Sequence, residues 1–140
     1  MCGIFAYKGN RNNAQEVVIK GLKKLEYRGY DSWGIAFKTD HTLNIHKQVG
    51  KIGDFKISDL KKINTKKNSQ KDDRNHQSLA NSFHSNLAVG HSRWATHGGV
   101  TQMNAHPHCT EKNEIAVVHN GIIENWQELL LPLLKVKKNK

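Results

Sequence analysis

The N-terminal stretch Met1-Cys2-Gly3-Ile4-Phe5 sets the strictest condition on how this chain folds. Once the initiator methionine is removed, the thiol of Cys2 and a free α-amino group share one residue. The reference pKa is about 7.7–8.0 for such an amine and about 8.5 for a thiol, so the amine can accept the thiol proton near neutral pH. This pattern favours a fold that brings the chain terminus into a reactive site. The alternative is that Cys2 is an ordinary residue of a buried first strand.

Length and composition indicate one polar domain. The chain has 140 residues, of which 36% are hydrophobic, and a mean hydropathy of −0.70. It contains no apolar run near the ~20 residues that a membrane span needs, and no signal-peptide pattern. Cys2 and Cys109 form no recognisable metal or disulfide motif. Together these features predict a cytoplasmic protein.

The net charge of +10 is concentrated in two segments. Residues 55–85 contain seven Lys or Arg and three Asp or Glu, and residues 135–140 contain four Lys, so each segment contributes +4. Basic segments can bind phosphate backbones non-specifically, but neither carries a series of aromatic residues for base stacking. A solvated loop and a basic tail are the favoured interpretation, and no specific nucleic-acid binding is predicted.

Hydrophobic periodicity predicts a mixture of strands and helices. Gly21 lies inside the first predicted helix and suggests close packing there. Pro132 should disrupt the last helix, because proline lacks the backbone N–H and its ring clashes with the preceding turn. The predicted elements are a strand at 3–8, a helix at 14–26, a strand pair at 33–38 and 43–49, a helical turn at 59–63, a strand at 87–90, a buried strand at 115–118 and a helix at 122–131.

The segment His91 to Gly99 concentrates groups that can bind a small polar ligand. Arg93 can grip a carboxylate with two parallel hydrogen bonds, which a lysine cannot do. Further along the chain, the side-chain amide of Asn120 and the backbone N–H of Gly121 could form an oxyanion hole. Such donors contribute roughly 10²–10³ each to the rate of acyl transfer.

Three other interpretations of these residues were weighed. Five histidines lie between positions 91 and 119, but their spacing matches no zinc motif and no carboxylate or thiolate completes a ligand set, so no metal is predicted. His97 could act on Cys109 as a Cys-His pair if the fold joined them. Each residue taken singly could also have a purely structural role in the core or in a turn.

Five stretches of the sequence form a recognisable set: Cys2-Gly3-Ile4-Phe5, residues 25–32 (LEYRGYDS), residues 91–98 (HSRWATHG), residues 104–108 (NAHPH) and residues 119–125 (HNGIIEN). Together they resemble the glutaminase domain of the glutamine–fructose-6-phosphate aminotransferases, also called glucosamine-6-phosphate synthases. They occur in the family's order, and the resemblance covers about residues 1–54 and 87–128. The wider class is the amidotransferases with an N-terminal nucleophile.

The resemblance implies an α+β fold of the N-terminal-nucleophile type, a four-layer sandwich of helices, two antiparallel sheets and helices. Cys2 would attack the side-chain amide of glutamine, Asn120 and Gly121 would form the oxyanion hole, and Arg28 would help to orient the nucleophile. Arg93 would hold the α-carboxylate of glutamine. Trp94, Thr96 and His97 would shape the pocket beside it. No cofactor is implied, and the ammonia would pass to a sugar-phosphate isomerase domain.

The sequence differs from the family at several places, and these differences leave a second interpretation open. The basic insertion at 55–85 is longer than the family's connection, and Trp33 stands where a small residue is usual. Nothing after Trp126 resembles the family's aspartate-containing stretch that binds the substrate's α-amino group. We therefore expect residues 1–134 to be a partial glutaminase domain lacking its C-terminal part, followed by a basic tail at 135–140. The alternative is a non-catalytic remnant that acts as an interaction fragment with a remainder on another chain, in an oligomeric state that stays open.

Overall fold

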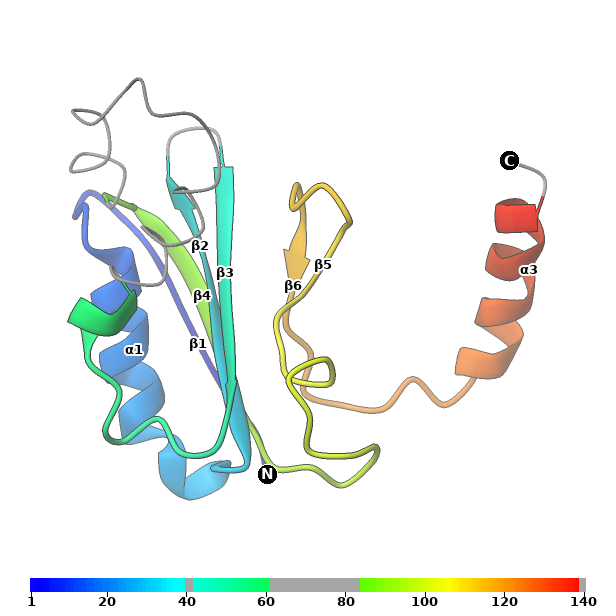
Figure 1. Ribbon diagram of the computed structural model, residues 1–140, viewed down its shortest axis with the longest axis horizontal. Coiled ribbons are helices and arrows are strands. Elements are labelled where there is room, and N and C mark those ends of the chain that lie inside the picture. The colour runs from blue at the N-terminus through cyan, green and yellow to red at the C-terminus, as the bar shows by residue number, and fades with distance from the viewer. Residues whose placement is uncertain (40–41, 61–83, 139–140) are drawn as a thin grey trace.

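The computed structural model describes residues 1–39, 42–60 and 84–138, with side chains up to residue 134. Figure 1 shows a main sheet with a helix on one face, a small hairpin on the other face, and a second helix standing apart. The elements in chain order are β1 (Gly3–Lys8), α1 (Ala14–Lys24), a 3₁₀ turn (Glu26–Arg28), β2 (Ser32–Thr39), β3 (Thr42–Val49), β4 (Leu87–Arg93), β5 (His108–Cys109), β6 (Ala116–Val117) and α3 (Trp126–Lys138).

The main sheet is antiparallel and has the strand order β1-β4-β2-β3. The predicted first strand and the predicted strand pair are confirmed, although residues 40–41 of their turn lie outside the described residues. The strand predicted from residue 87 continues to Arg93. Because β4 lies between β1 and β2, Gly3 pairs with Ser92, and Ser32 pairs with Arg93. The sheet thereby carries the N-terminus to the end of β4.

Helix α1 covers one face of this sheet. Its Val18 and Leu22 are fully buried in a cluster with Trp33, Ile35 and Phe37, which alternate along β2 and so share one face of the sheet. Such burial of large apolar side chains is the main source of stability in a small domain. The helix ends two residues earlier than predicted, and the chain turns into the 3₁₀ turn at Glu26.

Gly21 of α1 lies against β1. A Cβ added to this glycine would come within 2.4 Å of the Phe5 ring, so only glycine permits the observed separation of helix and strand. The close packing suggested by the sequence is confirmed. Trp33 is 1% exposed, and its ring packs edge-on against Phe55 at 4.6 Å. Trp33 therefore fills the core beneath α1.

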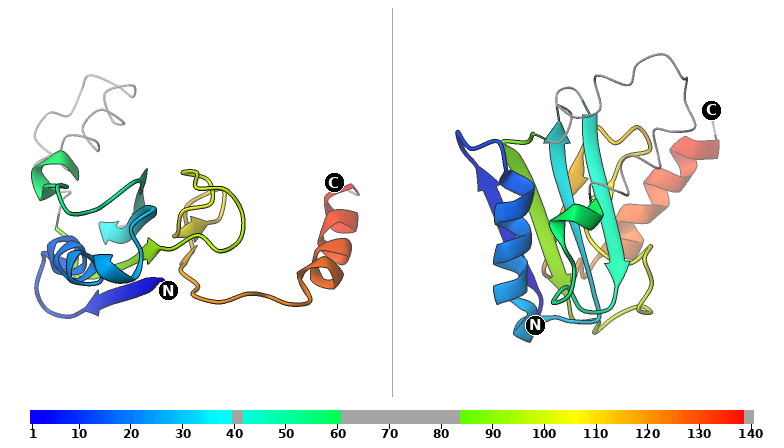
Figure 2. Two further views of the ribbon diagram at one scale, coloured as in Figure 1. Left: turned by 90° about the horizontal axis from the view of Figure 1, so that it is seen from below. Right: turned by 60° about the vertical axis from the view of Figure 1, so that its left-hand side comes forward.

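The opposite face of the sheet is covered by residues 94–117, which include the β5–β6 hairpin (Figures 1 and 2). Gly34 of β2 points to this side, where an added Cβ would lie 2.3 Å from the carbonyl oxygen of His106. The segment around His106 thus packs directly on the backbone of the sheet. Residues on this face of β4 alternate with those that face α1, and they include His91 and Arg93.

Two predictions about the second half of the chain were wrong. The strand predicted to be buried at 115–118 is the short β6, and Ile115 and Val117 are 60% and 55% exposed. Within the described residues, β6 pairs with only two residues of β5, so the hairpin is short. The helix predicted at 122–131 begins at Trp126 and runs through Pro132 to Lys138.

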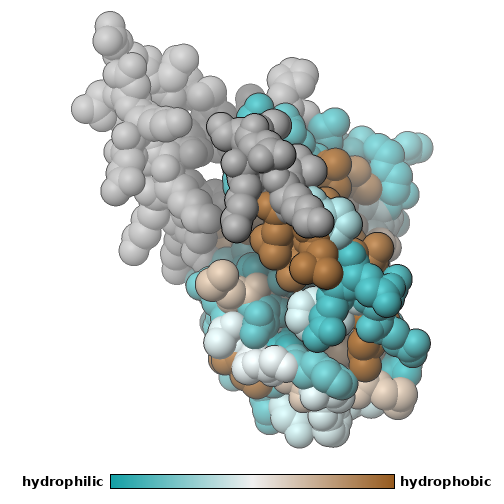
Figure 3. Space-filling view, turned by 90° about the vertical axis from the view of Figure 1, so that its right-hand side faces the viewer, coloured by the Kyte–Doolittle hydropathy of each residue, from teal (hydrophilic) through white to brown (hydrophobic). Residues whose placement is uncertain are grey.

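Helix α3 stands apart from both sheets in Figures 1 and 2. Its side chains at i, i+3, i+4 and i+7 form an apolar stripe, and Trp126, Leu129 and Leu133 are 53%, 52% and 65% exposed. Figure 3, which looks onto the side where α3 lies, shows apolar side chains at the surface. Within the described residues, none of the helices is long and apolar enough to span a membrane.

The basic segments lie largely outside the described part of the chain. Of the insertion predicted at 55–85, the structure describes residues 55–60 and 84–85, and residues 57–60 are helical. The rest of that insertion, including 61–63 of the predicted helical turn, lies outside the described residues, as do the side chains of the predicted tail at 135–140.

Candidate active site

Cys2 lies at the start of β1, beside the end of β4. The register between these two strands places Gly3 opposite Ser92, so Cys2 sits next to the backbone that follows Arg93. The N–H of Trp94 donates to the Cys2 sulfur at 3.4 Å, and the sulfur faces the Trp94 carbonyl oxygen at 3.7 Å. The thiol is therefore held between the two polar groups of a single residue.

A pocket of about 540 Å³ opens in front of this thiol. Seven of the eight residues that the sequence singled out contribute to its lining: Cys2, Arg93, Trp94, Thr96, His97, Asn120 and Gly121. The eighth, Arg28, lies beside the N-terminus, where its Nη2 is 3.7 Å from the sulfur of Met1. The structure thus joins residues from the start, the middle and the end of the chain. Their individual roles stay predictions.

Asn120 contacts the backbone of Cys2. Its Nδ2 donates to the carbonyl oxygen of Cys2 at 3.2 Å. The ring of His119 packs over Gly121, since a Cβ on this glycine would lie 2.9 Å from His119 Nε2. The amide of Asn120 is therefore within reach of a group bound at the sulfur, as an oxyanion donor must be.

Arg93 is 8% exposed and anchors the loop that follows β4. Its Nη2 donates to the carbonyl oxygen of His97 at 2.5 Å and its Nη1 to that of Gly99 at 3.1 Å. A guanidinium carries five N–H donors, so donors remain for a carboxylate. The loop is further ordered by a 3.1 Å contact between Thr96 Oγ1 and His97 Nδ1.

Three imidazoles lie against one another in the lining of this pocket, a feature that the sequence alone did not indicate. The ring centroids of His91 and His106 are 4.6 Å apart, and those of His106 and His108 are 4.4 Å apart. The alternation of β4, which puts His91 and Arg93 on one face, is the signal that could have located the first of them. Within the described ranges, no three His, Cys, Asp or Glu side chains are arranged to hold a metal ion.

Burial keeps these imidazoles neutral. The pKa of His91 is lowered to about 4 by burial first, then by His106 and Arg93, while Asp31 opposes the shift. The pKa of His106 is lowered to about 4 by burial, then by His108 and Arg93. Burial also lowers the pKa of His108. At neutral pH these three imidazoles therefore add no positive charge beside Arg93.

We expect acid to destabilise the protein through this cluster. Between about pH 4 and 6.5 the unfolded chain binds a proton at His91 that the folded chain does not, so the free energy of unfolding falls as the pH falls through this window. Replacing His91→Leu should reduce the slope by up to about 1.4 kcal/mol per pH unit. Urea unfolding at a series of pH values measures the slope.

The exposed His84 provides the control for this prediction, because a change there should leave the slope unaltered. An equal slope in the parent protein and the His91→Leu variant would contradict the assignment.

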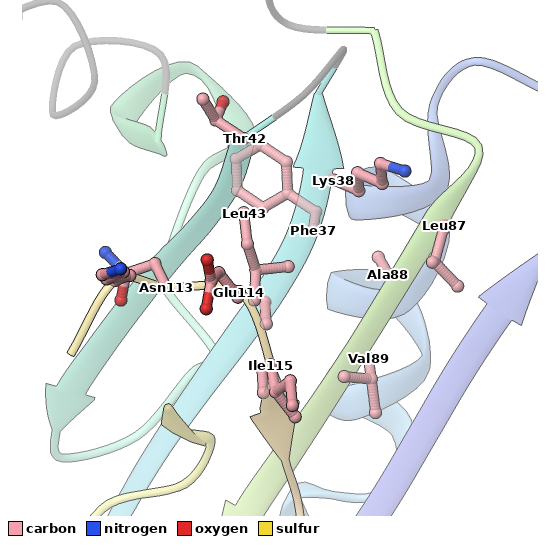
Figure 4. Close-up of a pocket in the computed structure, with 13 residues that line it drawn as sticks. Phe37, Lys38, Thr42, Leu43, Leu87, Ala88, Val89, Asn113, Glu114 and Ile115 are labelled. Carbon is pink, nitrogen blue, oxygen red and sulfur yellow. The ribbon is translucent and has the colours of Figure 1, made fainter. Parts of the chain in front are cut away.

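A larger cavity of about 710 Å³ lies elsewhere, between the main sheet and the β5–β6 hairpin. Figure 4 shows Phe37, Leu43, Val89 and Ile115 around it. It is lined mainly by apolar side chains and contains neither cysteine nor histidine. The thiol and the imidazoles belong to the smaller pocket at Cys2.

Two solved structures share this architecture. The chain matches glutamine phosphoribosylpyrophosphate amidotransferase from B. subtilis with a TM-score of 0.65 and 23% identity, over 96% of this chain and 25% of that chain. It matches a structure described as the allosteric regulatory enzyme of purine biosynthesis with a TM-score of 0.66 and 25% identity, over the same shares. The fold is therefore that of the N-terminal-nucleophile amidotransferases, α+β with antiparallel sheets and flanking helices, as predicted.

By sequence, the chain is similar to several glutamine–fructose-6-phosphate aminotransferases. It is 45% identical over 135 residues to the enzyme of Fusobacterium nucleatum and to that of Pyrococcus horikoshii, covering 96% of this chain and 19% of each relative. It is 47% identical over 131 residues to the enzyme of Methanococcus maripaludis, covering 92% and 18%. The chain thus spans about a fifth of the length of these relatives. No family model matches it.

Proposed function

We propose that this chain hydrolyses the side-chain amide of glutamine with Cys2 as the nucleophile. The observation that carries the proposal is the convergence of the thiol, the Asn120 amide and the Arg93 guanidinium on one 540 Å³ pocket. A thiol, an amide donor and a carboxylate clamp are the groups that acyl transfer from a free amino acid requires. The names of the homologues, all glutamine-dependent aminotransferases, support the same substrate.

The reaction begins after removal of Met1, which frees the α-amino group of Cys2. The Cys2 sulfur forms a bond to the amide carbon of glutamine while the thiol proton moves to the α-amine. The carbon–nitrogen bond then breaks, and the departing nitrogen takes that proton and leaves as ammonia. Water adds to the γ-glutamyl thioester, the carbon–sulfur bond breaks, and glutamate and the free thiol result.

Two donors stabilise the oxygen of the tetrahedral intermediate in this scheme. Asn120 Nδ2, now bonded to the Cys2 carbonyl oxygen at 3.2 Å, turns toward the substrate oxygen, and the Gly121 N–H provides the second donor. Arg93 uses its remaining N–H donors for the α-carboxylate of glutamine. Trp94, Thr96 and His97 line the side of the pocket where that end of the substrate binds. Arg28 orients the N-terminal residue.

The relatives' names imply that the ammonia serves an amino-sugar synthesis. We propose that this chain, which spans about a fifth of such an enzyme, supplies ammonia to a sugar-phosphate isomerase domain. Within the proposal this chain contributes the glutaminase step alone.

A second candidate function is favoured by the exposed apolar stripe of α3. Trp126, Leu129 and Leu133 are more than half exposed, as expected of a surface that a partner covers. In this proposal the chain is a non-catalytic fragment that associates with a separate chain carrying the rest of the glutaminase domain. Co-expression with the remaining part of a relative's glutaminase domain should give a complex on co-purification. If neither a complex nor glutaminase activity is found, this second function is excluded.

The proposed catalytic role of Cys2 can be tested with an electrophilic analogue of glutamine, such as its diazoketone. We expect one equivalent of label on Cys2 of a chain that lacks Met1, because the pocket directs the reagent to this thiol. Intact-mass and peptide mass spectrometry report both features. Cys109 is exposed and free, so it controls for non-specific alkylation and should stay unlabelled.

Free glutamine should protect Cys2 in this experiment. Retention of Met1, equal labelling of both cysteines, or a lack of protection by glutamine would overturn the proposed mechanism.

A further inference from the structure

Asp31 ties together three segments around the start of β2. Its backbone N–H donates to the carbonyl oxygen of Arg93 at 3.2 Å, and its carbonyl oxygen accepts from the N–H of Gly50 at 2.7 Å. One carboxylate oxygen accepts from the Ser32 hydroxyl at 2.8 Å, and the other accepts from the backbone N–H of Ala95. Asp31 is thus hydrogen-bonded through its backbone and through both of its carboxylate oxygens.

The residue between Arg93 and Ala95 is Trp94, which contacts the Cys2 sulfur. Trp94 follows Arg93 and precedes Ala95, so Asp31 holds the backbone on both sides of it. The Trp94 N–H donates to the Cys2 sulfur at 3.4 Å, and the Trp94 carbonyl oxygen lies 3.7 Å from the same sulfur. The position of both groups at the thiol therefore depends on the bonds that Asp31 makes.

The turn before Asp31 also packs against the backbone at the end of β4. A Cβ on Gly29 would lie 2.7 Å from the carbonyl carbon of Arg93 and 2.8 Å from the oxygen of Ser92. The turn and the end of β4 are therefore in direct backbone contact. In this arrangement the carboxylate of Asp31 is the side-chain acceptor for the loop's Ala95 N–H.

We infer that Asp31 is a positioning residue for the Cys2 thiol: its carboxylate fixes the backbone of residues 93–95 so that the Trp94 N–H stays directed at the sulfur. The inference deepens the proposed function and rests on Cys2 being the nucleophile. The thiolate is the reactive form of cysteine, and a hydrogen-bond donor directed at it favours that form. Loss of the Asp31 carboxylate should therefore make Cys2 less reactive.

The sign of this effect separates positioning from simple charge. Removing the negative charge of Asp31 would by itself favour a nearby thiolate and speed its reactions. Loss of the Trp94 contact has the opposite effect. The other charged or titratable groups that line the pocket with Cys2 are the same in both proteins. They are the N-terminal amine, His91, Arg93, His97, His106, His108 and His119, with Arg28 beside Met1. A slower reaction thus reports the backbone contact.

The test compares the parent chain with Asp31→Ala and Ser32→Ala, using iodoacetamide and peptide mass spectrometry from pH 6 to 9. Asp31→Ala removes the acceptor of the Ala95 N–H. In this variant Cys2 should be alkylated about three- to tenfold more slowly at pH 7, the range expected for one lost hydrogen bond, and its rate profile should move to higher pH. Cys109, exposed in β5, serves as the internal reference and should react at the parent rate. Ser32→Ala removes a bond to the same carboxylate but leaves the loop contact, so its Cys2 should react as in the parent.

An unchanged or faster reaction of Cys2 in Asp31→Ala would overturn the inference. If that variant does not fold, Asp31→Glu replaces it, since glutamate keeps the charge but displaces the carboxylate by one methylene. The same loss at Cys2 relative to Cys109 is then expected, and equal rates would overturn the inference. Iodoacetamide requires no glutamine site, so this result stands apart from success or failure of the glutaminase assay.

Discussion

A Cys2→Ala variant is expected to lose glutamine hydrolysis by at least about 10³-fold, because no other group can form the thioester. Within the described residues, the Cys2 sulfur is hydrogen-bonded to the backbone of Trp94. Removing the thiol should therefore leave the fold intact. Glutamate release, followed with a coupled dehydrogenase assay, measures the loss. Circular dichroism checks that the variant is folded.

Cys109→Ala is the matched control, since both changes remove a free thiol. Cys109 lies in β5 and does not line the pocket at Cys2, so its variant should hydrolyse glutamine at the parent rate. Full activity of Cys2→Ala, or equal loss in both variants, would contradict the proposed nucleophile.

A Trp33→Ala variant is expected to lose about 3–5 kcal/mol of unfolding free energy. Trp33 is 1% exposed and packs against Phe55 and His46, so truncation leaves a large cavity beneath α1. Small domains have total stabilities of about 5–15 kcal/mol, so this change removes much of the margin. Urea unfolding followed by circular dichroism, which does not depend on the deleted fluorophore, measures it.

Trp126→Ala makes the same chemical change on α3, where the side chain is 53% exposed. Its effect should stay within about 0.5 kcal/mol, as for other surface substitutions. Similar effects of the two variants would contradict the placement of Trp33 in the core.

The elements of the main sheet and α1 could be predicted because each has a clear period. Val18 and Leu22 recur at helical spacing, and Trp33, Ile35 and Phe37 alternate along one face of β2. Periodicity does not give the order of strands, and the placement of β4 between β1 and β2 is a long-range pairing. That pairing is what brings Cys2 to Trp94.

The second half of the chain was harder to predict, because its tertiary packing outweighs the local sequence patterns. The strand signal at 115–118 is real, but β6 pairs through two residues only and remains exposed. Pro132 does not end α3, since the carbonyl of Glu128 that it leaves without a helical N–H partner lies on an exposed helix, where water can bond to it.

The candidate site was predicted residue by residue from a resemblance, and the structure gathers these residues in one pocket. The cluster of His91, His106 and His108 was not predicted, because the segment from 104 to 108 packs on Gly34 through a tertiary contact that no local sequence pattern indicates. Asp31 was likewise noted only as a motif residue. Its bonds to Arg93 and Ala95 become visible only in three dimensions.

The pairing of Gly3 with Ser92 has a consequence for biosynthesis. Strand β1 leaves the ribosome long before β4, so the nascent terminus waits without a partner while the intervening residues are translated. Met1 is accessible to an aminopeptidase throughout that interval, and at 75% exposure it stays accessible after the sheet has closed. The removal of Met1 that the proposed function requires can therefore take place during translation or after folding.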